Sequence, residues 1–122
     1  MYTSILHASL IIADTQRSLH FYHNILGLEI DKQRPDLGFP GAWLNIGDQQ
    51  IHLLELPNPD PVDGRPKHGG RDRHTAIGVT NLAQLIQILD EHNIQYTSSS
   101  SGRKALFCRD PDGNALEFIQ VN

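Results

Sequence analysis

The stretch DPDGNALEFIQV, residues 110–121, contains the clearest local signals in the chain. Asp-Pro-Asp-Gly has the composition of a β-turn, because proline presets one backbone angle and glycine accepts a left-handed one. The apolar run KALFCRD, residues 104–110, leads into the turn, and NALEFIQV, residues 114–121, leaves it. Two such runs joined by a tight turn predict a β-hairpin, with Glu117 inside its second strand.

The segments before this hairpin complete a module. HTAIGV, residues 74–79, has the composition of a strand, and IQYTS, residues 94–98, predicts another. Between them, apolar residues recur at helical spacing, which predicts a helix from Leu82 to His92. The second half of the chain is therefore expected to follow the order β-α-β-β-β.

The first half repeats this order. Asp14 or Thr15 is a suitable N-cap for a helix over residues 15–26, and Gly27 is a suitable C-cap. Strands are predicted on both sides of this helix, at SILHASLIIA (4–13), LEIDKQ (28–33), AWLNIG (42–47) and QQIHLLEL (49–56).

A stretch rich in proline and glycine, residues 57–73, separates the two halves. We therefore predict an α+β fold of two βαβββ modules. The predicted organisation is a single domain over residues 1–122, with module one at 1–56, the connector at 57–73 and module two at 74–122.

Superposing the predicted modules places side chains of types that can bind a metal at matching positions. The first strands align His7 with His74, and the last strands align His52 with Glu117. A polar group inside an apolar strand costs free energy unless it has a partner. One bound cation would explain all four residues, whereas the alternative is that each serves its own local hydrogen-bond network. Three imidazoles and one carboxylate favour a divalent transition metal, which could be nickel, zinc, iron, cobalt or manganese.

Other residues have plainer interpretations. Glu55 competes with His52 as a ligand, but alternation along a strand puts these two side chains on opposite faces. Cys108 is expected to be a packed thiol, because no activating partner is evident. The other histidines fall in predicted helices or in the connector and are expected at the surface: His20, His23, His68 and His92.

Two groups of residues allow either a binding or a structural interpretation. Basic residues near strand ends could bind an anionic group of a substrate or could simply be solvated: Arg71, Arg73, Arg103 and Lys104. Aromatic residues in strands could line a pocket or could fill the core: Trp43, Phe107 and Phe118.

The composition argues against several classes of function. Hydrophobic residues make up 39% of the 122 residues, which is enough for a core without disulfide bonds, and Cys108 is the single cysteine. A net charge of −4 disfavours binding to nucleic acid. No apolar run is long enough to cross a membrane, and the N-terminus lacks the pattern of a secretory leader. We therefore expect a cytoplasmic protein that binds neither nucleic acid nor membrane.

Four stretches carry a resemblance to a known family: His7-Ala-Ser-Leu, SLHFYHNILGLEI (18–30), GGRDRH (69–74) and DPDGNALE (110–117). With the paired βαβββ modules, they resemble the vicinal oxygen chelate superfamily of glyoxalases, bleomycin resistance proteins and extradiol dioxygenases. The resemblance covers nearly the whole chain. It implies an incomplete β-barrel around a metal site, a small-molecule substrate with adjacent oxygens, and a homodimer.

The similarity to glyoxalase I-like members implies a metal-dependent lyase or isomerase that acts on a small carbonyl substrate through a metal-stabilised enediolate. The implied metal ligands are His7, His52, His74 and Glu117, and Glu117 is also the implied catalytic base. One alternative is a resistance protein that binds a small molecule or transfers a thiol to it. Another is an iron-dependent extradiol-type dioxygenase, for which His7, His74 and Glu117 would be sufficient ligands.

Two departures from glyoxalase I bear on this expectation. His52 stands where glyoxalase I has a glutamate ligand, so Glu117 is the one ligand that is suited to proton transfer. Ile11 and Leu56 stand where glyoxalase I has an arginine and an asparagine that contact glutathione. These positions argue against glutathione recognition and leave lyase chemistry on another carbonyl substrate open.

Overall fold

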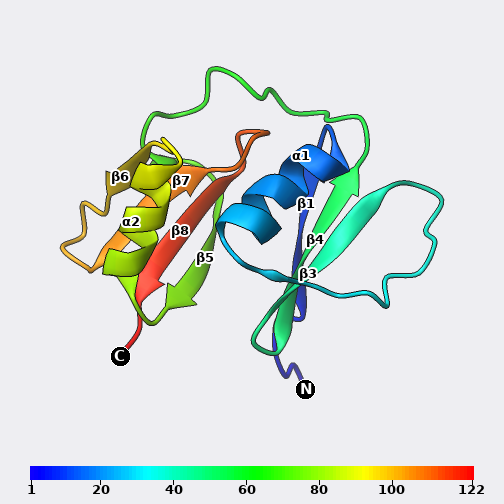
Figure 1. Ribbon diagram of the computed structural model, residues 1–122, viewed down its shortest axis with the longest axis horizontal. Helices are drawn as coiled ribbons and strands as arrows, with labels where there is room; N and C mark the ends of the chain where they lie inside the picture. Colours follow the sequence, from blue (N-terminus) through cyan, green and yellow to red (C-terminus); the bar gives the residue numbers. More distant parts are fainter. The chain divides into compact units, whose positions relative to one another are not determined.

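A four-stranded mixed sheet with helical structure on one face occurs twice along the chain (Figure 1). The computed structural model describes residues 1–122 and divides into two compact units, Met1–Asp60 and Pro61–Asn122. The first unit contains β1 (His7–Ile12), α1 (Thr15–Leu19), the π-helix η1 (His20–Ile25), β2 (Glu29–Ile30), β3 (Gly41–Ile46) and β4 (Gln49–Glu55). The second contains the short 3-10 helix η2 (Gly69–Arg71), β5 (His74–Val79), α2 (Leu82–Glu91), β6 (Tyr96–Ser98), β7 (Ala105–Arg109) and β8 (Ala115–Gln120).

The two sheets have the same topology. The strand order is β1-β4-β3-β2 in the first unit and β5-β8-β7-β6 in the second. The first and last strands of each unit pair in parallel, and the other neighbours are antiparallel. The register also agrees, because Ser9 pairs with His52 in one unit and Ala76 with Glu117 in the other. The predicted α+β fold of two βαβββ modules is confirmed.

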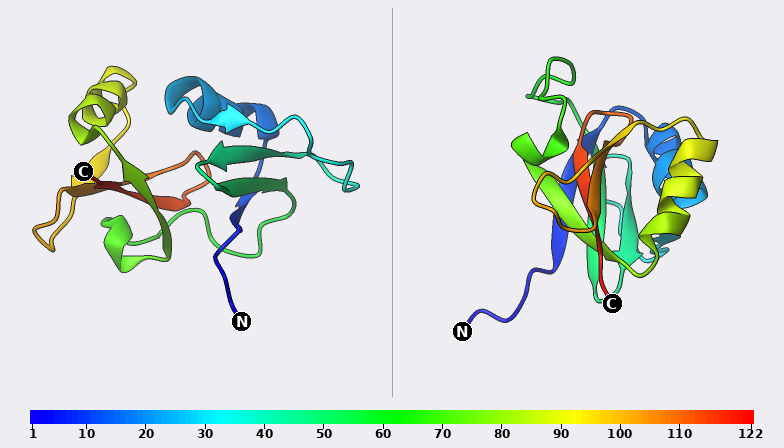
Figure 2. Two further views of the ribbon diagram at one scale, coloured as in Figure 1. Left: turned by 90° about the horizontal axis from the view of Figure 1, so that it is seen from below. Right: turned by 90° about the vertical axis from the view of Figure 1, so that its left-hand side faces the viewer.

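Each sheet has one face that packs under helical structure. Figure 2 shows α2 lying over its sheet, and the three leucines of α2 that recur at helical spacing, at positions 82, 85 and 89, are buried. Successive side chains of a strand point to opposite faces, so His52 and Glu117 lie on the face away from the helices. The strand residues of the helix-covered faces are buried: Ile12, Leu44, Ile51 and Leu53 in the first unit, and Ile77, Leu106, Leu116 and Phe118 in the second.

The turn between β7 and β8 is held by its first residue. The Asp110 carboxylate accepts hydrogen bonds from the backbone amides of Asp112 and Asn114, both at 2.9 Å, and from the Asn114 side chain at 2.9 Å. Gly113 has φ of +83°, a conformation that favours glycine, and an added Cβ would lie 2.9 Å from the Val62 carbonyl oxygen. The composition of residues 110–114 therefore fixes the hairpin that carries Glu117.

The helix that was predicted over residues 15–26 begins where expected but changes type. Asp14 is its N-cap, and α1 continues only to Leu19, where the π-helix η1 takes over. Phe21 and Tyr22 are adjacent in sequence, yet both are buried, and their rings meet edge-on with centroids 4.9 Å apart. Both aromatic residues of η1 therefore belong to the core of the first unit.

Several predicted elements are shorter in the structure or have different boundaries. The strand predicted at 4–13 is limited to β1, and the strand predicted at 28–33 is limited to the two residues of β2. Residues 61–73 of the predicted connector belong to the second unit, where residues 69–71 form η2. None of the helices is long and apolar enough to cross a membrane.

Candidate metal centre

The second unit brings His74 and Glu117 together on the face of its sheet opposite α2. His74 begins β5, and Glu117 lies on the neighbouring β8, where it pairs with Ala76. The Nε2 atom of His74 lies 3.3 Å from Oε1 of Glu117, and the two side chains are 28% and 4% exposed. The imidazole is thus open to solvent, whereas the carboxylate is almost fully buried.

The backbone around Asp72 determines how the His74 ring presents its nitrogens. Nδ1 of His74 lies 2.9 Å from the carbonyl oxygen of Asp72, which can only accept, so Nδ1 donates this hydrogen bond. In the neutral ring, Nε2 then carries a lone pair and faces another acceptor, Oε1 of Glu117. A proton shared between Nε2 and Oε1, or a metal ion bound by both groups, would stabilise this contact.

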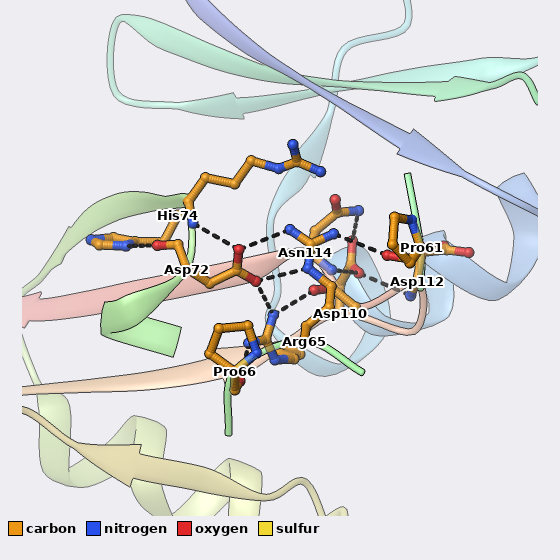
Figure 3. A network of polar contacts seen from close by, with 11 residues as sticks. Pro61, Arg65, Pro66, Asp72, His74, Asp110, Asp112 and Asn114 are labelled. Carbon is orange, nitrogen blue, oxygen red and sulfur yellow. Dashed lines mark hydrogen bonds and ion pairs between the residues drawn. The ribbon is translucent and has the colours of Figure 1, made fainter. Parts of the chain in front are cut away.

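A network of ion pairs holds Asp72 in place (Figure 3). Its carboxylate accepts hydrogen bonds from Arg65, at 2.8 and 3.0 Å, and from Arg109 at 2.8 Å. The Arg65 guanidinium is the main reason that the pKa of Asp72 is lowered well below its ordinary value. Arg109 also donates to the carbonyl oxygens of Gly113 and Pro66, so the network joins the chain before β5 to the β7–β8 turn.

Arg103 places a cationic group against the buried Glu117 carboxylate. Its Nη2 atom lies 3.1 Å from Oε2 of Glu117, although the Arg103 side chain is 58% exposed. Its Nε donates to the Ser101 hydroxyl at 3.1 Å. Of the four basic residues for which sequence left binding and solvation open, Arg103 is therefore the one placed against a predicted ligand.

In the first unit, His7 and His52 stack on each other. Their ring centroids are 3.8 Å apart with an interplanar angle of 12°, and Trp43 covers the other side of His52 at 4.3 Å and 7°. The Nε2 atom of His52 lies 2.8 Å from Oε1 of Gln50. Burial, followed by the nearby His7 and Arg34, lowers the pKa of His52, which favours the neutral imidazole that metals bind.

Each unit therefore pairs two of the four predicted ligands at equivalent positions. Within either unit, no three His, Cys, Asp or Glu side chains form a group that could hold a metal alone. Neutral imidazoles and one buried carboxylate are donors that transition metals accept, so these residues fit such an ion. His7 and His74 are exposed at the starts of their strands, His52 is half-buried and Glu117 is buried.

The structure also decides several of the other interpretations. Glu55 lies on the opposite face from His52, as predicted, and accepts from the Thr15 amide at 2.8 Å. Gln120 does the same for the Leu82 amide at 2.8 Å, which extends the repeat to the start of each helix. Cys108 is buried, and burial raises the pKa of its thiol to about 12, so it is a packed thiol as predicted.

One residue, His68, behaves differently from the expectation, and the surroundings of Trp43 were not predicted. His68 was expected at the surface, but it is half-buried, hydrogen-bonded through Nδ1 to Thr97 at 2.7 Å and edge-on to Phe107. The prediction failed because the sequence around His68 indicates only a loop, whereas Gly69 and Gly70 let that loop approach Phe107 closely. Trp43 was one of several candidate pocket residues, and nothing local in the sequence indicated that it would stack on His52.

Comparison with known proteins shows the family. The model of the Glyoxalase/Bleomycin resistance protein/Dioxygenase superfamily matches residues 4–118. The chain belongs to this superfamily.

Individual relatives agree with this assignment. The chain is 31% identical over 126 residues to Glyoxylase I 4 from Arabidopsis thaliana, covering 98% of this chain and 72% of that protein. It is 29% identical over 124 residues to a lactoylglutathione lyase from Haemophilus influenzae, covering 95% and 91%. The crystal structure of a glyoxalase family protein from Bacillus anthracis superposes with a TM-score of 0.83 at 22% identity, covering 100% and 98%. The last similarity shows the fold alone.

Proposed function

We propose that this member of the glyoxalase superfamily is a divalent-metal-dependent enzyme of the glyoxalase I type, a lyase or isomerase acting on a small carbonyl compound. The proposed ligands are His7, His52, His74 and Glu117, and the metal is nickel, zinc, iron, cobalt or manganese. Glu117 is also the proposed catalytic base. The superfamily generally uses divalent metals, and the lactoylglutathione lyase among the relatives supports lyase chemistry.

The observation that carries this proposal is the contact between His74 and Glu117. The Asp72 carbonyl fixes the proton of His74 on Nδ1, and Nε2 then faces the buried carboxylate at 3.3 Å. An acceptor pair of this kind is stabilised by a cation between its members. The equivalent register positions of the first unit hold His7 and His52, which supports a site built from both pairs.

The residues of the chain have distinct roles in this reaction. A divalent metal at this site would act as a Lewis acid that holds two adjacent substrate oxygens and stabilises negative charge on them. Glu117 would take the proton from the carbon beside the carbonyl and return it to the neighbouring carbon. Because His52 supplies no carboxylate, the same base serves both steps. Arg103, which contacts Glu117, lies where it can bind an anionic group of the substrate.

Elemental analysis and a single substitution test the proposal. Protein purified without chelators is expected to carry close to one equivalent of a divalent metal per chain, or to take it up from solution. Glu117→Gln keeps the shape of the side chain but should lower metal retention and slow turnover by roughly 10²–10⁴-fold. Assays would use methylglyoxal with and without glutathione, because Ile11 and Leu56 argue against glutathione recognition.

Glu55→Gln is the matched control for this substitution. In the first unit Glu55 accepts a hydrogen bond from the first residue of α1, and in the second unit the Gln120 amide accepts the equivalent bond from the first residue of α2. An amide at position 55 should therefore be tolerated. If the wild-type protein took up less than about half an equivalent of every metal in the transition series proposed here, the site assignment would be wrong.

One observation favours a second candidate function. Nε2 of His52 bonds to Gln50, so a site that uses only the remaining three residues, His7, His74 and Glu117, is the second candidate. Such a set resembles that of an extradiol dioxygenase or a thiol transferase. Unchanged metal affinity in His52→Ala, together with oxygen uptake on catechols or thiol transfer to a small electrophile, would support this candidate instead.

A further inference from the structure

A chain of side-chain hydrogen bonds leads to His52 across the open face of the first sheet. Glu29 Oε1 accepts from Nδ2 of Asn45 at 2.8 Å. Oδ1 of Asn45 and Oδ2 of Asp31 each accept from Nε2 of Gln50, both at 2.8 Å. Oε1 of Gln50 in turn lies 2.8 Å from Nε2 of His52. The proposed metal chemistry gives the outer members of this chain no role.

The two carboxylates fix the direction of every hydrogen bond in this chain. An ionised carboxylate only accepts, so the amide nitrogens of Asn45 and Gln50 must point toward Glu29 and Asp31. The amide oxygen of Gln50 is therefore left to face His52. Since that oxygen also only accepts, Nε2 of His52 must carry a proton and donate it.

The rings on either side of His52 fix its plane. His7 and Trp43 lie parallel to the imidazole at centroid distances of 3.8 and 4.3 Å, so the ring is held between them. The hydrogen bond to Gln50 fixes the remaining freedom, the direction in which each ring nitrogen points. In the neutral ring, Nδ1 is then the only nitrogen with a free lone pair.

We infer that His52 presents Nδ1, and not Nε2, to a metal ion, and that Gln50 is the positioning residue that sets this choice. The inference rests on the proposed metal site. It gives the two units opposite arrangements, because His74 donates through Nδ1 to Asp72 and keeps Nε2 for the site. Hydrogen bonds from the second ring nitrogen commonly orient histidine ligands in this way, and here a glutamine held by two carboxylate-terminated branches does so.

Nitrogen NMR of the full-length protein tests the first step without any metal. In protein labelled with ¹⁵N at histidine and held at mildly alkaline pH, His52 is expected to show a protonated Nε2 and a bare Nδ1. His74 is expected to show the reverse pattern in the same spectrum, which makes it an internal reference. A protonated Nδ1 on His52 would overturn the inference.

Gln50→Leu removes the acceptor and should shift the His52 signals toward those of a mixture of both tautomers. Gln49→Leu changes the same residue type on the opposite face of β4 and should leave the His52 signals unchanged. Should Gln50→Leu not fold, Asp31→Asn replaces the acceptor-only carboxylate. This variant should also weaken the preference of His52 for the tautomer that is protonated at Nε2. His52 signals that stay unchanged in every folded Gln50 or Asp31 variant would overturn the role of Gln50.

Titration with zinc, which is diamagnetic, tests the second step. Zinc is expected to shift Nδ1 of His52 and Nε2 of His74 while Nε2 of His52 keeps its proton. Gln50→Leu should weaken zinc binding about 10–100-fold, the range for residues that orient ligands. A zinc-dependent shift at Nε2 of His52, or at His74 without His52, would overturn the inference and leave the metal site standing. Absence of zinc binding altogether would instead remove the proposed function on which it rests.

Discussion

At the scale of single residues, Arg103 and a metal ion would compete for the same Glu117 carboxylate. Its guanidinium lies 3.1 Å from the carboxylate that would bind the metal, so in the metal-free protein it neutralises part of that charge. Because the Arg103 side chain is 58% exposed, water screens this ion pair and limits its strength. Arg103 is thus expected to compete weakly with a metal ion.

Arg103→Gln should therefore bind metal more tightly than the wild type, by roughly twofold to fivefold, since exposed ion pairs contribute up to about 1 kcal/mol. Isothermal titration of the metal-free protein with zinc or nickel measures this directly. Lys104→Gln removes the same charge from the next residue, which has no ion pair to Glu117, and serves as the control. Equal affinities for the two variants would mean that Arg103 does not compete at this carboxylate.

The sequence predicted which residues occupy matching strand positions better than it predicted the surroundings of those residues. His52 and Glu117 were found because the repeat aligned them, and the register of both sheets confirms that alignment. Contacts such as the ring of Trp43 on His52, or Arg103 on Glu117, join residues that are distant in sequence and share no pattern. Side-chain partners of this kind depend on the packing of the folded sheet, which periodicity does not report.

At the scale of elements, the Asp72 network supports the segment that enters β5. Arg65 and Arg109 both donate to the Asp72 carboxylate, and the side chains of Arg65 and Asp72 are each only 12% exposed. The pKa of Asp72 is lowered relative to the unfolded chain, so its contribution to stability is complete above the unfolded pKa. This contribution is lost as the pH falls below about 4, toward the lower pKa of the folded state.

Asp72→Asn should lower the free energy of unfolding at neutral pH by roughly 1–3 kcal/mol, because it leaves two half-buried guanidinium groups without their shared carboxylate. Urea denaturation at neutral pH and below about pH 4 checks this pH dependence. The difference in the free energy of unfolding between wild type and variant should become smaller in acid. Asp63→Asn, an exposed substitution in the same connector, is expected to be neutral at both pH values. A gap that is independent of pH would show that the charge of Asp72 is not the stabilising feature.

Element boundaries illustrate what local pattern can and cannot predict. β5 was predicted without error, because alternation and composition agree over residues 74–79. The helix at 15–26 has ordinary apolar spacing, but its second half, which holds the buried Phe21 and Tyr22, forms the π-helix η1. His68 shows the opposite case, in which a glycine-rich loop that looks solvated packs a histidine against the sheet. Tertiary packing decides such details and overrides the local preference.

At the scale of the whole molecule, the two units hold two candidate ligands each. A site of four ligands therefore requires a first unit and a second unit to contribute together. Proteins with repeated modules can satisfy this requirement within one chain or by exchanging modules between two chains of a symmetric dimer. We predict a homodimer, and light scattering at micromolar concentration should show a dimer. Subunit exchange then tests whether each site is private to one chain or shared between two.

Mixing two inactive variants distinguishes shared from private sites. His7→Ala damages only the first unit of its chain, and Glu117→Ala damages only the second, so neither homodimer should hold metal tightly. After subunit exchange, half of the dimers are mixed and each has one site with all four ligands, which should restore roughly a quarter of the wild-type metal content per chain. Mixing His7→Ala with His52→Ala is the control, because both changes fall in the first unit and no exchange can restore a site. Metal content that stays at the level of the separate variants after complete exchange would mean that each chain builds its site alone.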